Sequence, residues 1–191
     1  MSYNPNIHHR RSIRLKGYDY SQAGLYFITI CTKDRECFFG KIVGVENFQP
    51  VIILNDGGKF TNECWMEIPK HFPNVVLHEH IVMPNHVHGI VELSDATNVG
   101  AENFLPLHGR VQNFEPQQNS FQRMIPRSVG SIVKGFKIGV TKWFHANTDI
   151  ETLWQRNYHE HIIRNEKSYQ TISEYIINNP AKWNDDKFFI Q

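Results

Sequence analysis

Two histidines separated by one apolar residue, His86 and His88, lie inside the run HIVMPNHVHGIVEL at 80–93. Its apolar and β-branched residues favour β-strands, whose side chains alternate between the two faces of a sheet. Both imidazoles therefore point to one face, with their Cα atoms roughly 6.5–7 Å apart, and both can reach one metal ion. The pattern predicts a sheet that carries a pair of nitrogen ligands on one face.

Other segments show strand-like or helix-like patterns. Strand patterns are found at 25–32, at 41–56 as a hairpin or two short strands, at 74–84, at 85–93 and within 153–164. Apolar residues at helical spacing occur at 129–144 and 168–179, and a further helix is expected to begin at Thr61 as its N-cap. The order predicts an α+β fold of the ferredoxin-like (RRM-like) type, with an antiparallel sheet, helices on one face and a late helix that reaches the histidines.

The length of 191 residues fits a single domain over 1–191 with its own core. Residues 1–17 contain four basic residues and no acid, and we expect a basic N-terminal arm. Residues 95–127 are rich in Asn, Gln, Pro and Gly without apolar periodicity, which predicts a flexible insertion.

Three features indicate a cytoplasmic protein that does not enter a membrane. No run approaches the roughly 20 apolar residues of a membrane span, and the N-terminus has no apolar stretch typical of a secretory signal. Cys31, Cys37 and Cys64 are odd in number and lack CxxC spacing, which is typical of reduced thiols.

The net charge is only +1, but basic residues cluster in the arm and in 116–148, where no acid occurs. Such patches suit a polyanion such as nucleic acid, although a solvated helix face and a frayed terminus have the same composition. We expect phosphate contacts from basic and polar side chains, and base stacking from Trp154 unless it is a core residue. The expected DNA-binding residues are Arg10, Arg11, Arg14, Lys16, Lys134, Lys137, Lys142, Trp154, Gln155 and Arg156.

Tyr175 and Asn179 are four residues apart in SEYIINNP (173–180), a spacing that places both side chains on one face of a helix. A tyrosine hydroxyl can attack a phosphodiester and retain the phosphate covalently. An amide oxygen beside two imidazoles forms an open, mixed donor set that suits Mg²⁺ or Mn²⁺. Packing in the helix stripe is the alternative role for Tyr175, and Tyr158 is a rival nucleophile.

Two further histidine pairs have the same spacing, in His78-Glu79-His80 and in His159-Glu160-His161. Any such pair can be a surface or hydrogen-bonded pair without a metal. The turn at Met83-Pro84-Asn85 and the apolar residues that follow favour His86 and His88, because they anchor that pair on a buried strand.

Several segments together resemble the single-tyrosine HUH transposases, in particular the REP-associated tyrosine transposases. The segments are RRSIRLKGYDYSQAGLYFITICT (10–32), HIVMPNHVHGIVE (80–92), SIVKGFK (131–137), LWQRNYHEHIIRNEKSY (153–169) and ISEYIINNPAKW (172–183). The insertion at 95–127 is not part of the family pattern.

The resemblance implies that His86 and His88 bind the catalytic metal, that Asn179 is the third protein ligand, and that Tyr175 rather than Tyr158 is the nucleophile. It implies a Mg²⁺- or Mn²⁺-dependent endonuclease and strand transferase that cuts and rejoins single-stranded DNA beside hairpins through a 5′-phosphotyrosine. It leaves open whether the protein acts as a monomer or as a homodimer. Two other functions remain open: a non-catalytic module that binds hairpin DNA or RNA, and a metal-dependent phosphoesterase that uses water.

Overall fold

A four-stranded antiparallel sheet in the order β4-β5-β1-β6 organises the chain. The computed structural model describes residues 18–44, 50–94 and 125–185. The strands are β1 (Gly24–Cys31), β4 (Val75–Met83), β5 (His86–Leu93) and β6 (His159–Ile163). Chain order and strand order together are those of a ferredoxin-like fold, as the sequence predicted.

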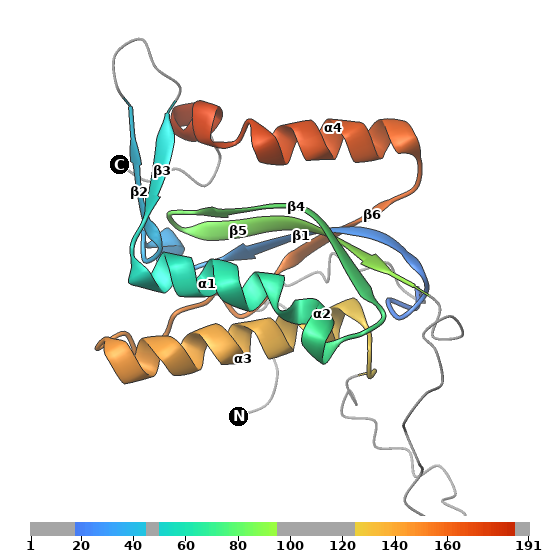
Figure 1. Ribbon diagram of the computed structural model, residues 1–191, viewed down its shortest axis with the longest axis horizontal. Helices are drawn as coiled ribbons and strands as arrows, with labels where there is room; N and C mark the ends of the chain where they lie inside the picture. The colour runs from blue at the N-terminus through green and yellow to red at the C-terminus, as the bar shows by residue number, and fades with distance from the viewer. Residues whose placement is uncertain (1–17, 45–49, 95–124, 186–191) are drawn as a thin grey trace, which may run out of the picture.

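Helices cover both faces of this sheet (Figure 1). On one face lie α1 (Asp56–Met66), α2 (Ile68–His71) and α3 (Val129–Asn147). On the other face lies α4 (Glu166–Ile177), the late helix, followed by the short helix η3 (Pro180–Asp185). The helical segments predicted at 129–144 and 168–179 are therefore confirmed, with shifted ends.

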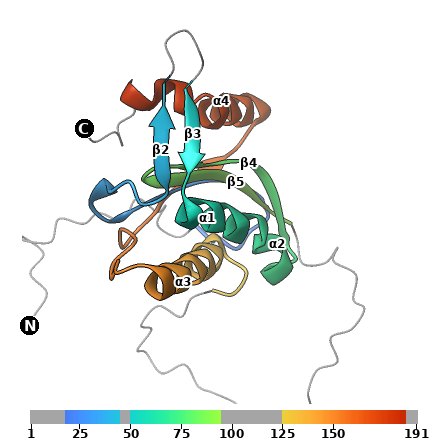
Figure 2. The same ribbon diagram turned by 60° about the vertical axis from the view of Figure 1, so that its left-hand side comes forward.

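A two-stranded ribbon formed by β2 (Gly40–Val43) and β3 (Val51–Leu54) stands apart from the main sheet (Figure 2). It follows the short helix η1 (Lys33–Arg35) and confirms the hairpin predicted over 41–56. The predicted basic arm and residues 95–124 of the predicted insertion lie outside the described residues, as do Arg10, Arg11, Arg14 and Lys16.

The first helix begins earlier than the sequence indicated. Asn55, not Thr61, is the N-cap, and its Oδ1 accepts a hydrogen bond of 2.8 Å from the backbone N–H of Gly58. Thr61 is buried within α1, where its hydroxyl donates to the carbonyl of Gly57 at 2.7 Å. Glycines disfavour helices and obscured this start. Glycine is needed at this helix start because another segment packs closely against it. A Cβ on Gly58 would collide with the carbonyl oxygen of Phe39.

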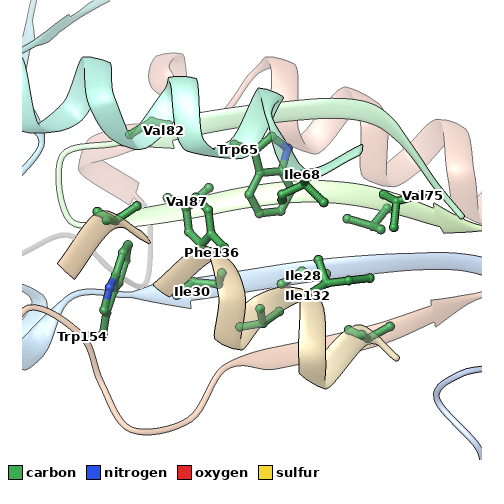
Figure 3. Packing of buried hydrophobic residues seen from close by; sticks show 14 of the residues in the cluster. Ile28, Ile30, Trp65, Ile68, Val75, Val82, Val87, Ile132, Phe136 and Trp154 are labelled. Atoms are coloured by element: carbon green, nitrogen blue, oxygen red, sulfur yellow. The ribbon is translucent and has the colours of Figure 1, made fainter. Parts of the chain in front are cut away.

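The larger core fills the space between the sheet and the layer of α1, α2 and α3. In Figure 3, Ile28 and Ile30 of β1 face Phe136 of α3, and Trp65 of α1 lies over the same face. Trp154 belongs to this core as well, with its indole N–H directed to the carbonyl of Lys137 at 3.3 Å. The sheet is therefore sealed on this face.

A smaller core lies under α4. It consists of the buried Ile90, Ile163 and Ile176 and of partly buried residues packed against them. The partly buried members are Leu25, Phe27, Ile81, Tyr169, Ile172 and Tyr175. Asn165 caps α4 by accepting a hydrogen bond of 2.9 Å from the backbone N–H of Ser168. The nucleophile predicted from the sequence thus lies on the helix that covers this second face.

Across the described ranges, no helix is both long enough and apolar enough to traverse a bilayer. Cys31, Cys37 and Cys64, which all belong to those ranges, form no disulfide.

Candidate active site

His86 and His88 lie on β5 and point to the α4 face of the sheet. Register with β1 pairs His88 with Thr29 and His86 with Cys31. Both histidines are almost fully buried, with exposures of 0% and 1%, and their ring centroids are 4.4 Å apart. The alternation predicted from the sequence is therefore present, and the two rings form one cluster.

One nitrogen of each imidazole is held by an oxygen of a neighbouring side chain. Nδ1 of His86 lies 2.8 Å from Oδ1 of Asn85, whose amide nitrogen donates to the carbonyl of Arg35 at 3.0 Å. Because Oδ1 can only accept, Nδ1 of His86 donates this hydrogen bond, and in the neutral ring the lone pair then lies on Nε2. Nδ1 of His88 lies 2.8 Å from Oγ1 of Thr29. Oxygen partners that orient a ring in this way are typical of metal-binding histidines.

Tyr175 reaches this cluster from α4. Its hydroxyl lies 3.3 Å from Nε2 of His88, and the two rings are 5.2 Å apart. Phe27 of β1 packs edge-on against Tyr175, with 6.1 Å between centroids and 89° between planes. The structure therefore brings together the phenol and the histidine pair that the sequence singled out.

Asn179 lies just beyond the end of α4 and is 1% exposed. The residues four positions before and after it contact the histidines: Tyr175 lies against His88, and Trp183 of η3 stacks on His86 at 6.1 Å and 24°. This placement makes Asn179 a candidate third ligand beside the two imidazoles.

The rival tyrosine and the other histidine pairs lie elsewhere. Tyr158 packs against the larger core, on the face opposite α4. His80 stacks on Trp65 at 6.0 Å, and burial lowers its pKa. His159 and His161 are exposed on the edge strand β6. Among the rivals that the sequence left open, none shares the cluster of His86 and His88.

The donor set is two imidazoles and one amide, and the described residues contain no group of three or more His, Cys, Asp or Glu that could hold a metal. A closed structural zinc site needs four such ligands. Two nitrogens and an amide oxygen, with positions left for water and a phosphate oxygen, fit an open site for Mg²⁺ or Mn²⁺.

The basic residues of α3 do not converge on this site. Lys134 and Lys142 are exposed on α3, which lies on the opposite face of the sheet from α4 (Figure 1). Lys137 is directed inward, and its Nζ donates to the carbonyls of Gln155 at 2.8 Å and Asn157 at 3.1 Å. Burial lowers the pKa of Lys137 to about 8. Its hydrogen bonds give Lys137 a structural role in place of the expected phosphate contact.

Trp154, expected to stack on a base, is 9% exposed and packs between Phe39 and Phe136 at 5.3 and 5.8 Å. Large aromatic rings contribute strongly to cores, and this one is unavailable to a base. The neighbouring Gln155 donates its backbone N–H to the carbonyl of Cys31 at 3.0 Å, at the His86 end of the sheet. Arg156 follows it and is exposed, so it remains a candidate phosphate contact near the site.

Sequence reasoning missed a polar cluster that fastens α4 to the sheet. Oε2 of Glu79 accepts hydrogen bonds from Tyr169 at 3.0 Å and from Ser173 at 3.1 Å. His78 lies 3.2 Å from the Tyr169 hydroxyl and 2.8 Å from Oε2 of Glu92. The spacing of Tyr169 and Ser173, one helical turn apart, was the available signal.

Comparison with known proteins places the chain in a family. No protein-family model matches it. A Haemophilus influenzae protein described as uncharacterized is 48% identical over 188 residues, which cover 98% of this chain and 97% of that protein. The chain belongs to the same family as this protein.

The resemblance to REP-associated tyrosine transposases is also confirmed. A second H. influenzae protein, named as a REP-associated tyrosine transposase, is 23% identical over 166 residues, or 86% of this chain and 74% of that protein. The solved structure of a REP-associated tyrosine transposase bound to a REP hairpin shares the fold, with a TM-score of 0.55 and 18% identity over 89% of this chain and 74% of that one. The structural similarity shows that the two proteins share a fold.

Proposed function

We propose that this protein is a metal-dependent DNA endonuclease and strand transferase of the HUH class, with Tyr175 as its nucleophile. The observation that carries the proposal is the distance of 3.3 Å between the Tyr175 hydroxyl and Nε2 of His88, inside the cluster that also holds His86. A transposase of the same fold is bound to a REP hairpin, which supports a hairpin as part of the substrate. We propose that the cut lies in single-stranded DNA beside it.

In this proposal the phenolic oxygen of Tyr175 attacks the phosphorus of a phosphodiester. The phenol gives up its proton, the bond to the 3′-oxygen breaks, and that oxygen takes up a proton to leave as a 3′-hydroxyl. The 5′-phosphate remains on the tyrosine, and attack by another 3′-hydroxyl transfers it and releases the phenol. A divalent cation held by His86, His88 and Asn179 would polarise a phosphate oxygen and stabilise the charge that develops. Thr29 and Asn85 fix the orientation of the imidazoles.

The geometry supports a site within one chain, because Tyr175 and both histidines belong to the same molecule. Arg156 is exposed near the His86 end of the sheet, and we propose that it contacts a backbone phosphate of the DNA. Lys134 and Lys142, on the far face, remain predicted contacts for a more distant part of the DNA.

The test compares Tyr175→Phe with Tyr158→Phe as its matched control. Labelled hairpin oligonucleotides with single-stranded flanks are incubated with each protein and Mn²⁺, and covalent adducts are resolved on a denaturing gel. We expect Tyr175→Phe to bind the hairpin but to form neither nick nor adduct, while Tyr158→Phe retains both. A chelator should stop cleavage without preventing binding, and Mg²⁺ or Mn²⁺ should restore it.

Other outcomes separate the alternative functions. Nicking by Tyr175→Phe together with loss of nicking in Tyr158→Phe would transfer the role to Tyr158. Nicking that survives in both tyrosine variants but disappears in His86→Ala would indicate a phosphoesterase that uses water. Hairpin binding without any nicking by the wild type would indicate a binding module.

A further inference from the structure

A hollow lies where the edge strand β6 meets the N-terminal half of α4. Its volume is about 540 Å³, which is within the usual range for sites that bind small molecules. It is lined by Phe27, His161, Asn165, Lys167, Ser168, Thr171 and Ile172. No step of the proposed cleavage uses this hollow.

The hollow is one aromatic ring away from the proposed nucleophile. Phe27, which lines it, packs edge-on against Tyr175 and lies 5.3 Å from the ring of His88. A group bound in the hollow would therefore be adjacent to a strand whose phosphate lies at Tyr175.

The lining side chains match the parts of a nucleotide. Phe27 and Ile172 offer apolar surface, and the exposed imidazole of His161 offers a flat ring on which a base can stack. Ser168 and Thr171 carry hydroxyls that can meet the polar edge of a base. Lys167 supplies a positive charge for a flanking phosphate.

A second hollow of about 340 Å³ continues along the same strand. It shares His161, Asn165 and Ser168 with the first and adds Arg164 as a second cation. Glu160 also lines this second hollow, so its wall carries charges of both signs. The two hollows are adjacent, because they share three lining residues.

We propose that the hollow at β6 and α4 binds one nucleobase of the single strand that flanks the scissile phosphate, and that it contributes to the choice of cleavage position. This inference rests on the proposed function, because the strand is its substrate. The occupant is a base rather than an isolated phosphate, since apolar and aromatic groups line the wall nearest Tyr175.

The test fills the hollow. Thr171→Trp places an indole in it from an exposed position on α4, and Gln170→Trp places the same residue on α4 at a position that does not line it. Each protein is given a library of hairpin oligonucleotides with randomised single-stranded flanks. Bound molecules and covalent adducts are sequenced separately, and circular dichroism and thermal melting verify that both variants fold.

We expect the wild type and Gln170→Trp to prefer a particular base at one flank position near the cut. Thr171→Trp should lose that preference alone, with binding weakened about 5- to 150-fold, the effect of losing one stacked base. His161→Ala should weaken the same preference. Identical base preferences in wild type, Thr171→Trp and His161→Ala would overturn the inference.

Failure of the proposed function gives a different result. In that case the wild type forms no covalent adduct, whatever base preference its bound pool shows. If the wild type forms the adduct and Thr171→Trp has the same base preference as the wild type, the proposed function stands and only the base site is rejected.

Discussion

The hydroxyl of Tyr175 lies 3.3 Å from Nε2 of His88, although 87 positions separate the two residues in the chain. The phenol comes from α4, and the imidazole comes from β5 in the middle of the sheet. Two separate sets of groups position this contact. One set orients His88, and the other holds α4 against the sheet.

Thr29→Val removes the oxygen that holds Nδ1 of His88 and keeps the shape of a buried side chain. Loss of such an outer partner typically lowers metal affinity by about 10- to 100-fold. We expect this decrease in Mn²⁺ affinity, measured by calorimetry. The matched control is Thr61→Val, which removes a buried hydroxyl that bonds only within α1. Equal Mn²⁺ affinities for the two variants would contradict a metal site at His88.

Glu79→Gln weakens the attachment of α4. Burial raises the pKa of Glu79, but hydrogen bonds from its own backbone N–H, Tyr169 and Ser173 outweigh burial and leave the pKa below its ordinary value. Because the folded pKa is the lower one, the carboxylate stabilises the fold at neutral pH, and this contribution disappears as pH falls through the folded pKa.

We therefore expect Glu79→Gln to unfold more easily than wild type at pH 7, with the difference vanishing in acid. Hydrogen exchange should increase in α4 at pH 7 while Trp65 and its neighbours stay protected. Denaturant titrations at several pH values measure the first effect, and Glu174→Gln, on the exposed side of α4, is the control. A stability difference that grows toward acid pH would refute this assignment.

Lys137→Met tests whether this lysine is structural. Its two hydrogen bonds to carbonyls support the segment at 155–157, so the variant should lose about 1–3 kcal/mol of unfolding free energy. The salt dependence of DNA binding should not change. Arg156→Met should do the opposite. Its stability should be unchanged, and the slope of the logarithm of the DNA-binding constant against the logarithm of the salt concentration should decrease in magnitude by about one. If Lys137→Met also decreases this slope, the DNA contact predicted for Lys137 is supported instead.

The same lysine predicts a pH effect. Burial lowers the folded pKa of Lys137 to about 8, below the value of about 10.4 for an unperturbed lysine. Between these values the unfolded chain binds more protons, so wild-type stability should rise with pH relative to Lys137→Met. Below pH 8 the difference between the two proteins should be flat, which denaturation at pH 7, 8 and 9.5 can measure.

Gly89→Ala should damage both the fold and the site. A Cβ at Gly89 would collide with the indole of the buried Trp65, and β5 would have to move beside His88. We expect a loss of about 1–3 kcal/mol, measured by thermal unfolding, together with weaker nicking. Gly135→Ala is the control, since its Cβ would lie at an ordinary 3.4 Å from Phe72 and should be tolerated. Equal stability of both variants would contradict the packing described for Trp65.

The sequence predicted the sheet and the placement of the two histidines, because period-two alternation alone decides which side chains share a face. It could not choose between Tyr175 and Tyr158 without the family resemblance, because the choice depends on which core each tyrosine packs against. For the same reason the sequence left Trp154 open between a core role and base stacking, and it predicted a phosphate contact for Lys137. Exposure is a tertiary property, and a basic or aromatic residue looks the same in a core as on a surface.

Pairing of His88 with Thr29 and of His86 with Cys31 couples assembly of the site to correct strand alignment. Displacing β5 by a single residue would turn both imidazoles toward α1 and α3 and send Val87 to the wrong side. A misaligned chain would thus lose the proposed cation site and the core packing together. If the proposed site binds a divalent ion, its uptake during refolding will report that the strands have reached their native register.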